Sequence, residues 1–236
     1  MIRAELANGM KLLVRPSAIS HSVAIRFCLQ TGSVHDPAGK EGLALATGLM
    51  LEEGTRKWTG KEIAERVDYL GAEIEAAVDK HSTVLSASAL EADAEEILAL
   101  FGAMATLPVF PRAELEKVKG QLATSIREER HDTRALALRS LVGLLYPARH
   151  PYRGRGGGTA ASVRSFTRGD LARFHAERYH PRGAILVVVG DIDPGRVRRV
   201  AVRALGRWRK KGDPGPPAVP DWAGPRRPAA RSIVVP

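Results

Sequence analysis

Alternation of apolar and polar positions predicts most of the strands. Asn8-Gly9 separates two short apolar runs, which is a strong local signal for a β-hairpin at the start of the chain. Every second residue from Val23 to Leu29 is apolar, so one face of this strand should be buried. The predicted strands are residues 2–6, 11–14, 23–29, 73–79, 81–89 and 184–189.

Apolar residues at helical spacing predict the helices. Residues 42–53 are apolar almost all round, which predicts a buried helix closed by Gly54. Thr59 can cap the helix that follows. The predicted helices are residues 42–53, 61–70, 93–104, 112–130, 134–145, 168–179 and 197–208. Because strands and helices come in pairs, the pattern predicts an α+β fold and not a doubly wound sheet.

Periodicity disappears near the end of the chain. We expect one domain over residues 1–211, followed by a Pro- and Gly-rich linker over 212–230. Residues 231–236 then begin a strand, which predicts the start of a second domain that is absent from this sequence. That second half would come from a longer parent chain or from another molecule.

Composition narrows the class of protein. The 236 residues are 44% hydrophobic and 26% charged, which is typical of a globular protein. Cys28 is the single cysteine, so no internal disulfide can form. The start lacks the pattern of a secretory signal, and no apolar run approaches the ~18 residues of a membrane span. We expect a soluble protein without a membrane partner, cytoplasmic by default, or periplasmic if a signal peptide was removed.

Charge is unevenly distributed along the chain. Residues 1–146 hold 17 basic and 20 acidic residues, a net charge of −3, whereas residues 147–236 hold 19 and 6, a net charge of +13. Such asymmetry can indicate a nucleic-acid partner. The arginines are scattered singly without interleaved aromatic residues, which favours a solvated surface and no nucleic acid. A face for an acidic partner is the better functional alternative.

Local motifs alone identify no active site. The Gly-rich loop 153–159 could cradle a phosphate, but it lacks the Lys-Ser/Thr ending of a P-loop and no strand leads into it. No two histidines have the i, i+4 spacing of a zinc-binding helix, and no nucleophile elbow is present. The histidines are His21, His35, His81, His131, His150, His175 and His180.

Several short segments, taken in order, carry a family resemblance. They are NGMK (8–11), TGS (31–33), GKEGLA (39–44), EGT (53–55), YLGAEI (69–74), HPY (150–152) and VVVGD (187–191). Together they resemble the pitrilysin, insulinase and mitochondrial-processing-peptidase family, whose active members carry an inverted zinc motif, His-x-x-Glu-His, on an early helix. The resemblance implies a metallohydrolase-type domain with a mainly antiparallel sheet and helices packed on one face.

The resemblance also implies that the metal site is lost. On the family's frame, the two zinc histidines fall at Leu45 and Leu49, and the water-activating glutamate falls at Gly48. The third ligand falls at Thr124 or Ser125. Zinc needs imidazole and carboxylate donors, and its bound water needs a general base. We therefore expect no catalytic, cofactor-binding or metal-ligating residue in this chain, and zinc only in active relatives or in a partner subunit.

The expected function follows from this loss. The chain resembles an amino-terminal half of the inactive-subunit type, which would pair with an active zinc-peptidase subunit, or with itself, and help to form a peptide-binding chamber. Glu75 replaces an asparagine with which active relatives hold the substrate backbone. Two alternatives stay open: an active metallopeptidase with other ligands, such as His35 or His81, and a basic module that binds nucleic acid or an acidic partner.

Overall fold

The computed structural model describes residues 1–210, 212, 215, 219–225 and 230. The strands are β1 (Ile2–Glu5), β2 (Lys11–Pro16), β3 (Ser22–Leu29), β4 (Glu73–Val78), β5 (Thr83–Leu90) and β6 (Ile185–Gly190). The α-helices are α1 (Leu43–Leu49), α2 (Gly60–Tyr69), α3 (Ala94–Thr106), α4 (Arg112–Glu128), α5 (Thr133–Leu145), α6 (Ala160–Arg164), α7 (Arg168–Arg178) and α8 (Pro194–Leu205). Three short 3₁₀ turns are η1 (Ser33–His35), η2 (Glu91–Asp93) and η3 (Pro151–Arg153).

The six strands form one mixed sheet in the order β1-β2-β6-β3-β5-β4. Only the β2–β6 pair is parallel among these strands, and the other four pairs are antiparallel. In the centre of the sheet, Ile25 of β3 lies opposite Ala87 of β5 on one side and Val188 of β6 on the other. The predicted α+β fold with a mainly antiparallel sheet is confirmed.

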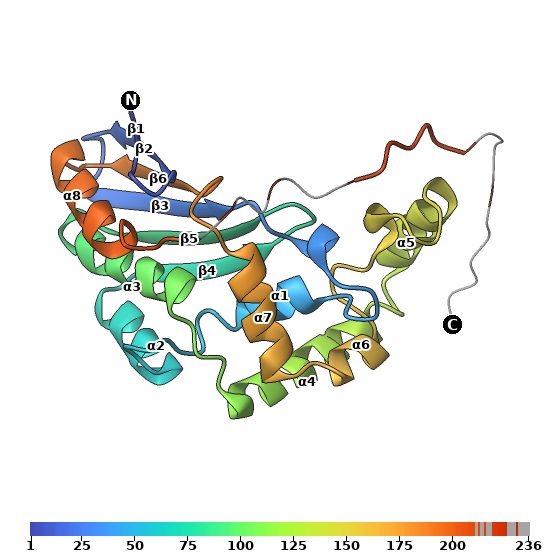
Figure 1. Cartoon of the computed structure of the whole chain (residues 1–236). Coiled ribbons are helices and arrows are strands. Elements are labelled where there is room, and N and C mark those ends of the chain that lie inside the picture. The colour runs from blue at the N-terminus through green and yellow to red at the C-terminus, as the bar shows by residue number, and fades with distance from the viewer. Residues whose placement is uncertain (211, 213–214, 216–218, 226–229, 231–236) are drawn as a thin grey trace.

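Helices cover one face of the sheet, as Figure 1 shows. The alternating residues from Val23 to Leu29 are buried on that face, and α1, α3 and α8 contact β4, β5 and β2 respectively. α7 packs against α1 in turn. The core therefore lies between the sheet and this helix layer, as the period-two pattern predicts. None of the helices in the described part of the chain is long and apolar enough to cross a membrane.

Three local predictions differ from the structure. The helix predicted over 197–208 spans Pro194–Leu205, because the Asp193 carboxylate caps it three residues earlier than expected. The helix predicted over 42–53 ends at Leu49, and residues 50–53 continue as turns before Gly54, whose φ of +141° suits glycine. The helix α6 was not predicted. Its start is capped by the Thr159 hydroxyl, which accepts from the Ser162 N–H. A five-residue helix is too short to show a helical period, so the pattern misses it.

The structure describes only part of the carboxy-terminal segment for which the sequence predicts a linker and a strand. Residues 231–236 lie outside the described residues, and so does part of the linker predicted over 212–230. Within the described part of that segment, the Trp222 indole N–H donates to the carbonyl oxygen of Leu145, at the end of α5. The His150 imidazole contacts the carbonyl oxygen of Pro220 at 3.3 Å. The division into domain, linker and second domain stays a prediction.

Candidate functional site

A cavity of about 640 Å³ lies between α1, α4, α5 and the loop that follows η3. Leu45, Leu49 and Ser125 line it together. These are the positions that the family resemblance assigns to the two zinc histidines and the third ligand. The fold therefore brings the three positions to one place, although they are far apart in the sequence. Thr124, the other candidate for the third position, is exposed and pairs with Arg127 at 3.0 Å.

The start of α1 is held by hydrogen bonds to the Asp36 side chain. The Asp36 carboxylate accepts from the backbone N–H groups of Gly42 and Ala44, each at 2.7 Å. Burial raises the pKa of Asp36 to about 7, against the lowering effect of these two hydrogen bonds. Leu45 and Leu49 are four residues apart, so they lie on one side of the helix and face the cavity while half-buried.

Gly48 lies on the inner side of α1, against β4. A Cβ atom at Gly48 would meet Cγ2 of Val78 at 2.4 Å, closer than real Cβ contacts allow. Gly48 is buried, and Val78 packs against the core. The space that a glutamate side chain would need at this position is thus filled by a valine of the neighbouring strand.

The residues of this cavity do not suit zinc. Leucine side chains carry no donor atom, and a serine hydroxyl is not among the nitrogen, thiolate and carboxylate donors that structural and catalytic zinc sites use. Throughout the part of the chain that the structure describes, no three His, Cys, Asp or Glu side chains gather closely enough to hold a metal ion. The three positions that the resemblance assigns to the zinc ligands therefore offer no zinc donor, and Glu129 is the single carboxylate among the residues that line the cavity.

The two histidines of the alternative peptidase hypothesis lie near each other. The His35 ring contacts the backbone of Gly32 at 3.2 Å, and burial lowers its pKa, with a smaller effect from the Arg178 charge. The exposed His81 ring contacts the Tyr152 hydroxyl at 3.0 Å. A zinc site needs at least a third protein ligand, and among the described residues no further His, Cys, Asp or Glu joins these two histidines in a metal-binding group.

Positive charges surround the opening of the cavity. Its lining includes Lys80, Arg139, Arg153 and Arg155, and one carboxylate, Glu129. Glu129 pairs with Arg155 and lies 3.8 Å from Arg139. The sequence does not reveal these residues as a group, because they are scattered along the chain and only the fold brings them together. The signal that could have found part of the site is the i, i+3, i+4, i+7 spacing along α5 of Ala135, Leu138, Arg139 and Val142, all of which line the cavity.

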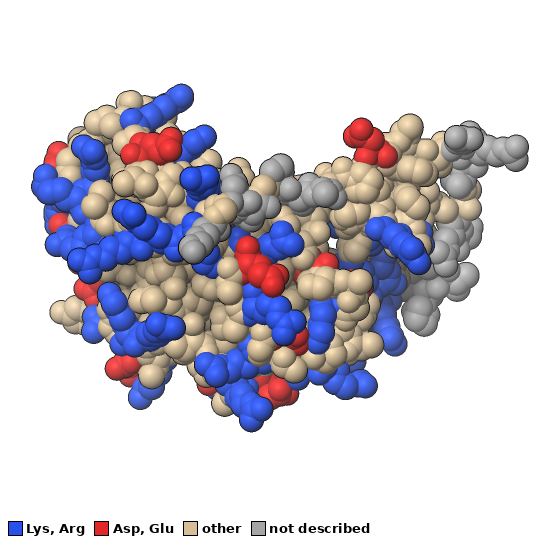
Figure 2. Space-filling model, in the orientation of Figure 1, with Lys and Arg blue, Asp and Glu red and all other residues tan. Residues whose placement is uncertain are grey.

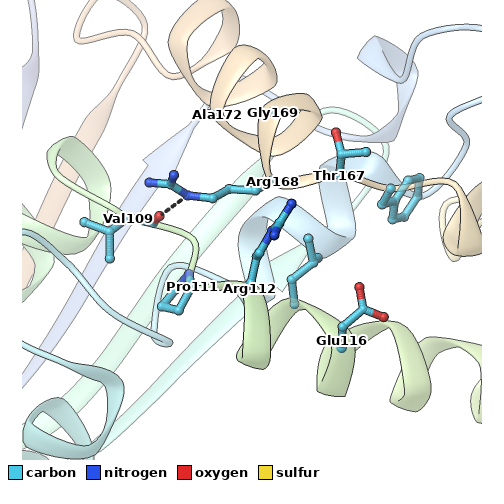
Figure 3. Close-up of a pocket in the computed structure, with 10 residues that line it drawn as sticks. Val109, Pro111, Arg112, Glu116, Thr167, Arg168, Gly169 and Ala172 are labelled. Atoms are coloured by element: carbon cyan, nitrogen blue, oxygen red, sulfur yellow. Dashed lines mark hydrogen bonds between the residues drawn. The ribbon is translucent and has the colours of Figure 1, made fainter.

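A second, larger hollow of about 1180 Å³ lies between the starts of α4 and α7, as Figure 3 shows. Arg168 donates to the Val109 carbonyl oxygen at 3.0 Å, and Arg112 points into the same space. The neighbouring Phe110 has a φ of 49°, which is unusual for a bulky residue. None of the positions singled out by the sequence lines this hollow.

Comparison with known proteins identifies the class of fold first. The solved structure described as the peptidase M16 inactive domain from Pseudomonas fluorescens superposes with a TM-score of 0.82 at 27% identity, covering 92% of this chain and 53% of that one. The periplasmic protease PqqL from Escherichia coli superposes with a TM-score of 0.79 at 21% identity, covering all of this chain and 25% of PqqL.

The sequence comparison then gives the family. The model described as Insulinase (Peptidase family M16) matches residues 12–143, and the model described as Peptidase M16 inactive domain matches residues 165–234. This chain belongs to the insulinase family, peptidase family M16. Relatives named as uncharacterized zinc proteases include one from Rickettsia bellii, 24% identical over 85% of this chain, and YmxG of Bacillus subtilis, 26% identical over 87%. This chain spans about half the length of both relatives, 48% and 50%.

Proposed function

We propose that this chain is a non-catalytic peptidase M16 subunit that pairs with an active zinc-peptidase subunit and helps to form a peptide-binding chamber. The observation that carries the proposal is the joint position of Leu45, Leu49 and Ser125 on one cavity, with Val78 packed where a general base would stand. On the frame that the resemblance gives, the fold of the family is kept while the residues at the three ligand positions carry no zinc-donor atoms. The proposal includes the absence of any catalytic or metal-ligating residue in the chain.

Two features support pairing with another subunit. The chain spans about half the length of the relatives that it matches, and a second half of this kind can belong to the same polypeptide or to a separate subunit. α5 exposes three leucines along its length, Leu138, Leu141 and Leu145. An exposed apolar stripe of this kind is typical of a surface that another protein covers. A heterodimer with an active subunit is the arrangement that we propose, with a homodimer as the alternative.

One edge of the sheet supports peptide binding. β4 is the last strand in the strand order, so its outer backbone groups have no strand partner among the strands that the structure describes. Such an edge can add an extended peptide as a further strand. Glu75 is exposed on β4, and the strand contacts α1, which forms one wall of the cavity. A peptide along this edge would therefore pass close to the cavity.

The basic surface gives weaker support to a nucleic-acid module. Figure 2 shows Asp and Glu side chains interspersed among Lys and Arg. On α8, Arg196 pairs with Glu91 and Glu95, and Arg203 pairs with Glu95. Part of the positive charge is thus neutralised within the fold, so this alternative lacks a specific observation in its favour. The compartment also stays a proposal, with the periplasmic location named for PqqL as the alternative to the cytoplasm.

Metal content, measured by mass spectrometry on protein purified without a histidine tag or chelator, tests the proposal. We expect far less than one zinc per chain. The variant Leu45→His/Leu49→His/Ser125→Glu is the matched positive control, because it would restore two imidazoles and a carboxylate around the cavity. Zinc near one per wild-type chain, with peptide cleavage lost on chelation, would contradict the proposal. Light scattering of the chain mixed with an active M16 subunit from the same genome tests pairing, and we expect a complex.

A further inference from the structure

We infer that the cavity between α1, α4 and α5 binds an acidic peptide segment that carries a large apolar side chain. The inference rests on the proposed peptide-binding function and adds the class of peptide. Two observations carry it: the walls of the cavity are aliphatic, and its opening is positively charged. No metal and no reaction step is involved, because the cavity acts only as a binding site.

The walls offer an apolar surface that is large enough for a bulky side chain. Six aliphatic side chains from three helices line the cavity: Leu45, Leu49, Leu122, Ile126, Leu138 and Val142. A volume of about 640 Å³ is within the range of ligand-binding pockets. Leu122 and Ile126 belong to the buried core, whereas Leu138 is 52% exposed. An inserted leucine or phenylalanine would remove the exposed part of this wall from water, which is favourable.

The opening selects for negative charge. Lys80, Arg139, Arg153 and Arg155 stand against the single carboxylate of Glu129, a net formal charge of +3 over these five groups. Glu129 is already shared between two of the arginines. Lys80 Nζ donates to the Gly154 carbonyl oxygen at 3.1 Å, and Arg153 donates to the Tyr146 carbonyl oxygen at 3.1 Å. Arg153 therefore rests on a neutral acceptor and remains available to a carboxylate, whereas Lys80 also interacts with the charge of Asp36.

The spread of the cations favours a peptide over a single-headed amphiphile. Lys80 follows β4, Arg139 lies on α5, and Arg153 and Arg155 lie in and after η3. Four charges from three segments match several carboxylates distributed along a chain, whereas a fatty acid presents only one. Charge complementarity across a site chiefly sets which partner binds and how fast it associates. A basic peptide would meet like charges on several sides of the opening.

Binding of labelled peptides to the full chain tests the inference by fluorescence anisotropy. The probe is a fluorescein-labelled ten-residue peptide with two leucines and a phenylalanine flanked by glutamates. One comparison peptide has lysine at every glutamate, and the other has serine at every apolar position. We expect the acidic apolar peptide to bind at least about tenfold more tightly than either comparison peptide, with an affinity that falls as salt rises.

Matched variants locate the binding. Arg139→Glu/Arg153→Glu should remove the preference for the acidic peptide, and Leu49→Asp should weaken its binding by about tenfold or more. The control is Arg198→Glu, an exposed position on α8, which should leave the affinity unchanged. Circular dichroism of each variant confirms that the fold is kept. Equal affinity for acidic and basic peptides, or unchanged binding in Arg139→Glu/Arg153→Glu, would overturn the inference, as would binding of dodecanoate without binding of the peptide.

The result can be separated from the test of the proposed function. Peptide binding is measured on the chain alone, and subunit pairing is measured by light scattering. A complex with the active subunit but no charge preference would remove the inference and leave the proposed subunit role intact. A clear preference for the acidic peptide without any complex would support the inference and contradict the pairing.

Discussion

α4 and α5 are neighbouring helices with similar apolar spacing and opposite environments. Along α4, four apolar residues are at most 8% exposed: Leu115, Val118, Leu122 and Ile126. Along α5, three leucines are 37–52% exposed, and only Leu136 is buried. α4 packs against α1 and α6, whereas the described contacts of α5 are mainly with η3. Helical spacing of apolar residues thus indicates a face that needs a partner, and the fold supplies that partner to α4 only.

The sharpest test of this comparison is truncation of one leucine on each helix. Leu115→Ala on α4 should lower the free energy of unfolding by about 2–5 kcal/mol, since it truncates a side chain that is only 2% exposed. Leu141→Ala on α5 should change it by less than about 0.5 kcal/mol, because its side chain is already half-exposed. Urea unfolding followed by circular dichroism measures both. Similar losses in the two variants would show that α5 is packed as firmly as α4.

The sequence predicts the elements of this fold better than their arrangement. Within the described part of the chain, all six strands and seven of the eight α-helices match predicted elements, because their periods are local properties of the chain. The position of β6 between β2 and β3 was not predicted. Such pairing depends on contacts between residues more than 150 positions apart, for example Ile25 with Val188. No local pattern encodes which strands become neighbours.

For the cavity, too, the sequence predicts some of the residues but not their arrangement in space. The resemblance placed Leu45, Leu49 and Ser125 at related positions, and the structure brings them together. The helix around Leu45 was expected to be buried all round, yet Leu45 and Leu49 are only half-buried. A run of apolar residues does not reveal which side of a helix faces a cavity. The positive charges of the opening were not predicted either, because they come from separate segments that only the fold joins.

α1 contains both kinds of environment on one helix, so a second prediction compares its two sides. Gly48→Ala on the inner side should destabilise the fold by about 1–3 kcal/mol, because its Cβ would meet Cγ2 of Val78. Val78 is β-branched, so its side chain has few ways to move aside. Leu45→Ala on the cavity side should cost less than the α4 truncation, since Leu45 is half-exposed. Thermal unfolding of purified variants measures both effects.

The double variant Gly48→Ala/Val78→Ala is the control for this prediction. If the contact between the two side chains causes the loss, removal of the valine methyl groups should recover part of it. The sum of the two single effects should then exceed the effect of the double variant. Strict additivity would mean that Val78 is not what restricts position 48, and the argument against a side chain there would fail.

The burial of the packed region around α7 can also be tested by the pH dependence of stability, because His175 on α7 is buried there. Its Nε2–H donates to the Ala105 carbonyl oxygen at 2.9 Å, and the ring is almost completely buried. Burial lowers the pKa of His175 from 6.5 to about 4, with the Lys210 charge acting in the same direction. The unfolded chain therefore takes up a proton at higher pH than the folded one. Stability from this residue is complete above pH 6.5 and is lost as the pH falls toward 4.

His175→Gln removes this titration while its amide can still donate to the Ala105 carbonyl oxygen. The variant should be less stable than the wild type at pH 8, because the glutamine loses the ring contacts with Phe110 and Tyr179. That deficit should shrink by about 2 kcal/mol at pH 5, where the wild type alone bears the cost of a buried neutral ring. Asp36, whose raised pKa acts in the opposite direction over this range, is present in both proteins and cancels in the difference. Denaturant unfolding at pH 8 and pH 5 measures this difference in stability. A deficit that is the same at both pH values would mean that water reaches His175 in the folded protein. The region around α7 would then be packed as loosely as α5.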